Sequence, residues 1–265
     1  MTGIADSWWL VPLTMALVCG LTCPLLGTVL VIQQQVMNTN LMAYAVLPGL
    51  VIGQALNLDP VVGGLLSALA TVALIEPWLD AHHASGRNSD AVRNTALAGC
   101  LGLGVLLIQL FDVRLELDAL LFGDLLTATS SDLCWLVLSA VVLLGLLRWR
   151  FTDLQWLGLD PEAAAERELP IRRLRLAMAV ATAMVVVTAT TAVGLALVMA
   201  LICGPALLGL HHARSLTQAL TRAAFVGTGV SMGGCGLALG LNQPPGPLMA
   251  LLACCCLPVL AWQRH

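Results

Sequence analysis

Residues 176–213 read LAMAVATAMVVVTATTAVGLALVMALICGPALLGLHHA and contain no Asp, Glu, Lys or Arg. A helix that crosses a bilayer needs about 20 apolar residues, so this run is long enough for two crossings with a break around residues 188–194. Backbone polar groups must be paired within the segment in hydrocarbon, which leaves helices or closed barrels. Barrel strands alternate apolar and polar residues over about ten positions, whereas this run is continuously apolar. The run therefore predicts two membrane helices joined by a turn.

The rest of the chain follows the same pattern. Of the 265 residues, 59% are hydrophobic and 10% are charged, whereas soluble domains carry roughly 25% charge. Residues 7–58 and 223–263 are also long runs of low charge, with breaks at residues 33–40 and 242–247. We expect an all-α, polytopic membrane bundle that forms one transmembrane domain over residues 1–265, with about nine crossings, eight being the alternative. The expected spans are residues 8–32, 41–57, 60–79, 94–111, 133–149, 176–191, 193–210, 219–241 and 246–262. Residues 119–129 are too short to span and are expected to form an interfacial or re-entrant helix.

The arginines predict the orientation. The chain has no lysine, and six of its twelve basic residues flank one loop, at residues 148–175. Cytoplasmic loops are enriched in Arg and Lys, so this loop is expected inside. Nine crossings then place every arginine except Arg114 on the cytoplasmic side. The N-terminus would lie outside and the C-terminus in the cytoplasm of a cell with this protein in its plasma (inner) membrane. Residues 1–6 lack the basic start of a cleaved signal, so the first apolar run is expected to be retained.

Motifs for chemistry are missing from the sequence. There is no GxxxxGK[ST] loop, no HExxH pair and no nucleophile elbow. The nine cysteines lie mostly inside apolar runs and form no CxxC pair, as expected for small buried hydrophobes. The histidine pairs at residues 82–83 and 211–212 are interpreted as polar loop residues. We therefore expect no enzyme activity and no cofactor bound by this chain.

Polar groups in the second expected span point to transport. Asn40 and Tyr44 are four residues apart, so they share one helix face. The pair Pro48-Gly49 should kink or interrupt the same helix, and broken membrane helices are tolerated where they are buried or line a cavity. These residues, with Met42, predict a translocation path. Ordinary helix packing with an interfacial tyrosine is the alternative.

Five segments in order resemble the permease subunits of zinc- and manganese-type ABC importers. They are GTVLV at residues 27–31 leading into AVLPG at 45–49, LFGD at 121–124, LDPEA at 159–163 with LP at 169–170, VGLALV at 193–198 through PA at 205–206, and PPGP at 244–247. The resemblance implies two permeases, expected as a homodimer, that work with cytoplasmic ABC ATPase subunits, which use the ATP, and an extracytoplasmic metal-binding protein. It also implies transport of Zn²⁺ or Mn²⁺, or of iron. By position, residues 204–218 would be the helix that couples to the ATPase, with Gly204, Pro205, His211, His212 and Arg214.

The chain departs from the family at its expected metal site. The family has Asp and His where this sequence has Asn40 and Tyr44, and Asn offers only a neutral carbonyl. The path could carry a metal with weaker ligands, helped by Met42, or another substrate, or transport could be lost. A secondary transporter driven by an ion gradient is the rival class, with Glu76 as its best ionisable candidate. A non-transporting assembly or sensor subunit is a third possibility.

Overall fold

The computed structural model describes residues 10–81, 87–111, 123, 129–159, 170–211, 213–241 and 243–255. Every regular element within these ranges is an α-helix, which confirms the all-α class. The helices, in chain order, are α1 (Leu10–Ile32), α2 (Val36–Ala55), α3 (Pro60–Ala81), α4 (Arg87–Leu110), α6 (Ser130–Trp149), α7 (Phe151–Leu159), α9 (Ile171–Val193), α10 (Leu195–Leu210), α11 (Leu216–Leu241) and α12 (Pro245–Cys254).

Five of the described helices are long and apolar enough to cross a membrane, namely α1, α2, α4, α6 and α9. Shorter apolar helices are residues 60–75 of α3, α10 and α12. Each of the nine expected spans coincides with a helix over most of its length. The number of crossings, and the side on which each end of the chain lies, remain predictions.

The three expected breaks in the long apolar runs all separate two helices. Residues 33–35 join α1 to α2, and residues 242–244 join α11 to α12. Between α9 and α10 the break is one residue, Gly194, whose φ is +92°. Residues with a side chain rarely adopt that backbone conformation, so glycine allows the chain to end one helix and begin the next without a loop. The break at residues 33–35 is shorter than expected, because α2 begins at Val36.

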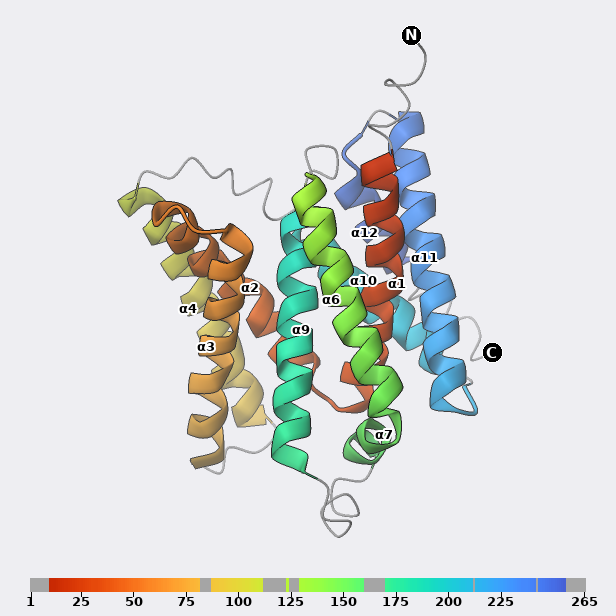
Figure 1. The fold of residues 1–265 in the computed structure, drawn as a ribbon, viewed down its shortest axis with the longest axis horizontal. Coiled ribbons are helices and arrows are strands. Elements are labelled where there is room, and N and C mark those ends of the chain that lie inside the picture. Colours follow the sequence, from red (N-terminus) through yellow and green to blue (C-terminus); the bar gives the residue numbers. More distant parts are fainter. Residues whose placement is uncertain are drawn as a thin grey trace.

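The helices form two groups on either side of a central pair (Figure 1). One group contains α1, α10, α11 and α12, and the other contains α2, α3 and α4. Helices α6 and α9 lie between them, and α9 contacts α2 and α3 on one side and α1 and α10 on the other. Two hydroxyl contacts tie helices together within this bundle: Ser139 on α6 lies 3.0 Å from Thr188 on α9, and Ser231 on α11 donates to the Ala16 carbonyl at 2.6 Å.

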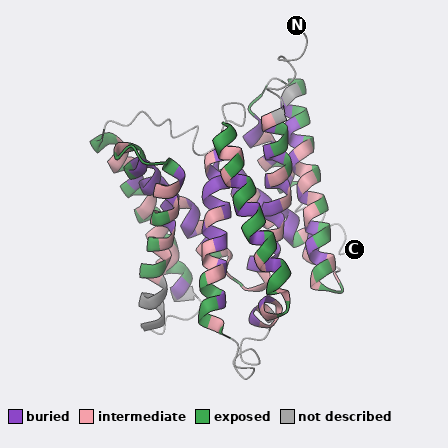
Figure 2. Cartoon of the chain, in the orientation of Figure 1, coloured by how far each residue is buried: buried purple, intermediate pink, exposed green. Residues whose placement is uncertain are grey.

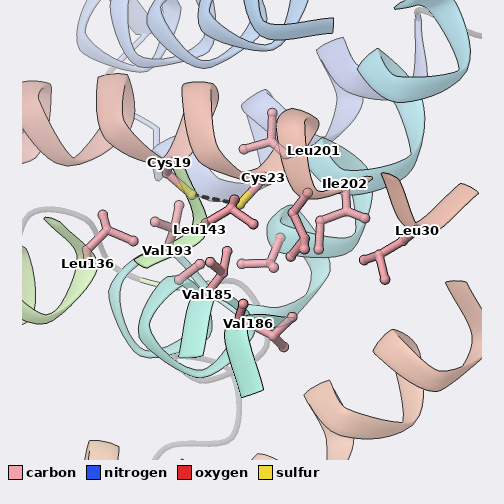
Figure 3. Close-up of a cluster of buried hydrophobic side chains, with 14 of the residues drawn as sticks. Cys19, Cys23, Leu30, Leu136, Leu143, Val185, Val186, Val193, Leu201 and Ile202 are labelled. Atoms are coloured by element: carbon pink, nitrogen blue, oxygen red, sulfur yellow. Dashed lines mark hydrogen bonds between the residues drawn. The ribbon is translucent and has the colours of Figure 1, made fainter. Parts of the chain in front are cut away.

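The main apolar core lies between α1, α6, α9 and α10. Figure 3 shows part of it, where Leu143, Val185 and Leu201 surround two buried cysteines on α1. The outer faces of α4 and α6 carry many exposed large apolar residues (Figure 2), including Leu106 and Val141. Such faces are suited to contact with lipid hydrocarbon, because exposing so much apolar surface to water would be unfavourable.

Candidate transport site

Helix α2 carries the residues expected to line the path, and it is continuous through Pro48. Proline has no N–H, so it cannot bond to the carbonyl four residues earlier, and its ring crowds the preceding turn. Ser67 on α3 supports this turn, because its Oγ donates a hydrogen bond of 2.7 Å to the Ala45 carbonyl. Helix α2 is therefore not interrupted at Pro48, and the bond from Ser67 connects α3 to the turn that precedes it.

The residues beside Pro48 bring α2 against α3 and α4. A Cβ atom at Gly49 would lie 2.3 Å from the carbonyl oxygen of Gly63, so the two backbones are in direct contact. On the other side, a Cβ atom at Gly104 of α4 would lie 3.4 Å from the backbone nitrogen of Pro48. Pro48 itself is buried. The Pro48-Gly49 pair therefore lies where α2 packs closely against α3 and α4.

Three of the expected path residues, Asn40, Met42 and Tyr44, do not all lie on the same face of α2. Tyr44 is half-buried and packs against the main core. Met42 is buried in a second cluster with Val46 and Val187, on the side of α2 that faces α3 and α9. Positions two apart in a helix point about 200° from each other, so Met42 lies opposite Asn40, which is half-buried. Asn40 and Tyr44 can line one path together, but Met42 cannot join them on the same face.

A cavity of about 460 Å³ lies on the Met42 side, bounded by α1, α2, α3 and α9. Its walls are mostly apolar, and include Leu69, Val72 and Ala179. Two guanidinium groups, of Arg172 and Arg175, line it near the start of α9. The following residues complete its polar lining: Gln35, Asn38, Thr39 and Thr182. We call it the arginine cavity.

Two polar groups in the arginine cavity differ in how they are satisfied. The Asn38 Oδ1 atom accepts a hydrogen bond from Arg93 of α4, which also contacts Ser89 and lies 3.7 Å from Asp90. Thr182 is 2% exposed, and its Oγ1 has no hydrogen-bond partner among the described residues. A buried hydroxyl without a partner is costly and marks a place where a ligand oxygen could bind.

A second cavity, of about 330 Å³, lies at the opposite end of the same helices. Asp59 and Asp132 line it, together with Gln54, Ser131 and Thr191. Asp132 accepts hydrogen bonds from the Thr129 amide at 2.9 Å and the Thr129 hydroxyl at 2.6 Å, which fixes its carboxylate at the start of α6. We call it the acidic cavity. From Met42 to Leu50, α2 spans about 12 Å, and the apolar second cluster fills this distance between the two cavities.

The structure divides the expected coupling segment, residues 204–218, between two helices and the turn that joins them. Residues 204–210 are not part of one helix with residues 211–218, because they form the last turns of α10. Gly204 and Pro205 are buried, and a Cβ atom at Gly204 would lie 2.8 Å from the Ala253 carbonyl of α12. These two residues therefore pack α10 against α12 inside the chain.

The exposed part of that segment is the turn between α10 and α11. His211 ends α10, and Arg214 is exposed. The side chain of Gln218 accepts a bond of 3.0 Å from the Arg214 amide, while the Gln218 amide donates to Ser215 Oγ at 3.3 Å. These reciprocal bonds cap the start of α11. His212 lies outside the described residues, as do most of the LFGD and LDPEA segments, the histidines at 82–83 and the side chain of Glu76.

No group of three His, Cys, Asp or Glu side chains that could hold a metal occurs among the described residues. Two soft ligands, Cys19 and Cys23 on α1, lie with their sulfur atoms 3.4 Å apart in the apolar core (Figure 3). Two thiols surrounded by aliphatic side chains behave as part of the core. Asn40 has an amide oxygen and Tyr44 a phenolic oxygen, so neither adds to such a group.

A family model of the ABC 3 transport family matches residues 9–263 of this sequence. The chain belongs to this family. The membership confirms the resemblance drawn from the five motifs, and the chain is a multi-pass membrane permease of this ABC transport family.

Named relatives of this ABC 3 chain come from several bacteria. It is 25% identical over 241 residues to the chelated iron transport system membrane protein YfeD of Yersinia pestis, which covers 89% of this chain and 79% of the relative. It is 23% identical to the high-affinity zinc uptake system membrane protein ZnuB of Haemophilus influenzae, over 87% of each chain. The fold is similar to that of PsaBC from Streptococcus pneumoniae, solved in complex with Fab, with a TM-score of 0.87, 23% identity and coverage of 97% of this chain and 92% of the other.

Proposed function

We propose that the chain is the membrane-spanning subunit of an ATP-driven importer of a divalent transition metal, zinc, manganese or iron. Its partners would be cytoplasmic ABC ATPase subunits and an extracytoplasmic metal-binding protein. Family membership and the names of relatives from zinc, manganese and chelated iron systems support this proposal. A homodimer is the simplest assembly, because closed two-fold symmetry is the commonest arrangement of oligomers.

The observation that carries the proposal is the charge difference between the two cavities. Carboxylates of Asp59 and Asp132 line one, and guanidinium groups of Arg172 and Arg175 line the other, at opposite ends of α2, α3 and α9. Carboxylates at a mouth raise the local concentration of a cation and speed its entry. The arginine end is expected inside, so the acidic cavity would face outward, as an importer of cations requires.

We place the path on the Asn40 and Tyr44 face of α2. Gln54, which lines the acidic cavity, falls within roughly 80° of both residues around the helix, whereas Met42 lies on the far side. The arginines beside Met42 would repel a cation that entered there. Along this face the metal would meet neutral oxygen ligands, which bind it weakly and release it readily.

Coupling to the ATPase is proposed for the turn between α10 and α11. Arg214 is exposed, and the bonds of Ser215 and Gln218 cap the start of α11. These features suit a surface that transmits a movement of the ATPase to α10 and α11. His211 and His212 would belong to the same surface.

The path is tested by restoring the family's ligands. The variant carrying Asn40→Asp and Tyr44→His should bind the metal more tightly during transport, and so show a lower KM for uptake in proteoliposomes with the ATPase and binding protein. Met42→Leu is the matched control on the opposite face and should leave KM unchanged. An unchanged KM in the double variant, or a larger change in KM in the Met42→Leu variant, would show that the path lies elsewhere.

A further inference from the structure

The residues that line the arginine cavity differ from those expected along a path for a metal cation. A transition metal cation is repelled by guanidinium groups, and carboxylates or imidazoles are its usual ligands. None of the described residues that line this cavity is Asp, Glu or His. The cavity is instead basic at one end and aliphatic along its walls, which suits a ligand with an anionic group joined to a hydrocarbon chain.

The basic end is well formed for an anion. Arg172 and Arg175 are three residues apart, so they lie on the same face of α9. Both are in the first two turns of a helix of 23 residues, where the backbone amides add positive potential. Neither guanidinium forms an ion pair with any described side chain. Two arginines together can bind a phosphate in the bidentate manner that such groups favour.

The apolar part of the cavity has the size and depth for a chain. Its volume of about 460 Å³ lies in the range of small-molecule sites, about 300–1,000 Å³. Leu69 and Val72 of α3 line it on one side, and Ala179 and Val180 of α9 on another. Thr182, the buried hydroxyl without a partner, lies seven residues beyond Arg175, about 10 Å along α9. Ala179 and Val180 lie between Arg175 and Thr182 along the helix, so a ligand that meets both ends must be longer than a phosphate ion.

We propose that the arginine cavity binds an anionic glycerophospholipid, with its phosphate on Arg172 and Arg175 and an acyl chain along α3 and α9. Basic sites between membrane helices are well suited to anionic headgroups, and the cytoplasmic leaflet, where the arginines are expected, contains such lipids. The site is separate from the Asn40 and Tyr44 face, and the proposal does not depend on which substrate is transported.

The test is native mass spectrometry of the purified full chain with added lipid. Dioleoyl phosphatidylglycerol should bind at one site more tightly than the remaining lipids, dioleoyl phosphatidylcholine should not compete for it, and millimolar inorganic phosphate should not displace it. Equal binding of phosphatidylcholine would overturn the proposal. Displacement by inorganic phosphate would also overturn it, in favour of a free phosphate site. These comparisons use the unmodified protein, so they do not depend on whether a variant folds.

Variants then locate the site. At about fivefold for each guanidinium near a membrane surface, Arg172→Gln with Arg175→Gln should weaken phosphatidylglycerol binding about 30-fold. Arg173→Gln is the matched control, because Arg173 lies between them and does not line the cavity, and it should change binding less than twofold. Ala179→Leu should block the apolar part, whereas Ala177→Leu, outside the cavity, should not. Unchanged affinity in the double arginine variant, or an equal loss in the Arg173 control, would contradict the assignment.

Discussion

The hydroxyl of Ser67 on α3 lies 2.7 Å from the carbonyl oxygen of Ala45 on α2, three residues before Pro48. This bond connects two helices near the proline, on the side of α2 that faces α3. The two helices that it joins also have the most extensive contact of any pair of described helices. The polar groups of α2 are therefore held by α3 in a fixed position relative to the rest of the bundle.

Replacing Ser67 by alanine should remove this bond and lower the free energy of unfolding by about 1 kcal/mol, a typical value for a hydrogen bond between membrane helices. Thermal unfolding of the purified protein in detergent measures the change. Thr228→Val is a suitable control, because the Thr228 hydroxyl bonds only to the Ala224 carbonyl in its own helix. A Ser67→Ala protein as stable as the wild type would show that α3 does not support the Pro48 turn.

Replacing Gly49 by a larger residue should prevent the close contact between α2 and α3. A leucine at Gly49 would place Cβ 2.3 Å from the Gly63 carbonyl, so we expect loss of folded protein. Overpacking a close contact commonly costs about 1–3 kcal/mol. Gly102→Leu on α4 is the control, since no atom lies within 4 Å of a Cβ at that position. The yield of monodisperse protein in size-exclusion chromatography should fall for the first variant only, and equal yields would contradict the close contact.

The coupling turn and the buried end of α10 should respond differently to mutation. Arg214→Glu changes an exposed side chain, so the permease should remain folded but lose most of its stimulation of the ATPase. Gly204→Leu should instead destabilise the protein, because its side chain would collide with Ala253. ATPase activity and thermal stability, measured on both variants, separate the two effects. Full stimulation by the Arg214→Glu protein would rule out this turn as the docking surface.

The acidic cavity should control how fast a cation enters. Asp59→Asn removes one carboxylate from its lining, and we expect the rate of uptake at low metal concentration to fall several-fold in low salt. The difference should shrink in 0.5 M salt, because screening shortens the range of the charge. Asp90→Asn, at the other end of the bundle beside Arg93, is the control and should leave entry unchanged. A loss for Asp59→Asn that did not depend on salt would argue against electrostatic attraction.

The helices and their breaks could be predicted from the sequence because their causes are local. Gly194, the polar residues at 33–35 and the prolines at 244–245 each end or begin a helix through their own chemistry. Reliance on local polarity also explains why the expected span begins at residue 41, whereas α2 begins at Val36. Asn38 has the polarity of a loop residue, but Arg93, 55 residues away in the sequence, satisfies it within the folded helix.

The candidate site could be predicted only in part. The sequence indicates that Asn40 and Tyr44 share a face, and helical geometry already puts Met42 on the other one, although all three were assigned to one path. Arg172 and Arg175 were read only as markers of orientation. The cavity that they line is formed by α1, α2, α3 and α9, and no spacing along the chain brings those four helices together. The burial of Gly204 results from the packing of α10 against α12, which no spacing along the chain predicts.

The central claim is that this chain conducts a divalent metal inward when its ATPase hydrolyses ATP. The direct measurement is uptake of radioactive zinc, manganese and iron into proteoliposomes that contain the permease, with its ATPase on the inside and its binding protein on the outside. We predict accumulation of at least one of the three metals that requires ATP and stops when a catalytically inactive ATPase is used. Absence of ATP-dependent accumulation of all three, in vesicles where the permease stimulates ATP hydrolysis, would contradict the account.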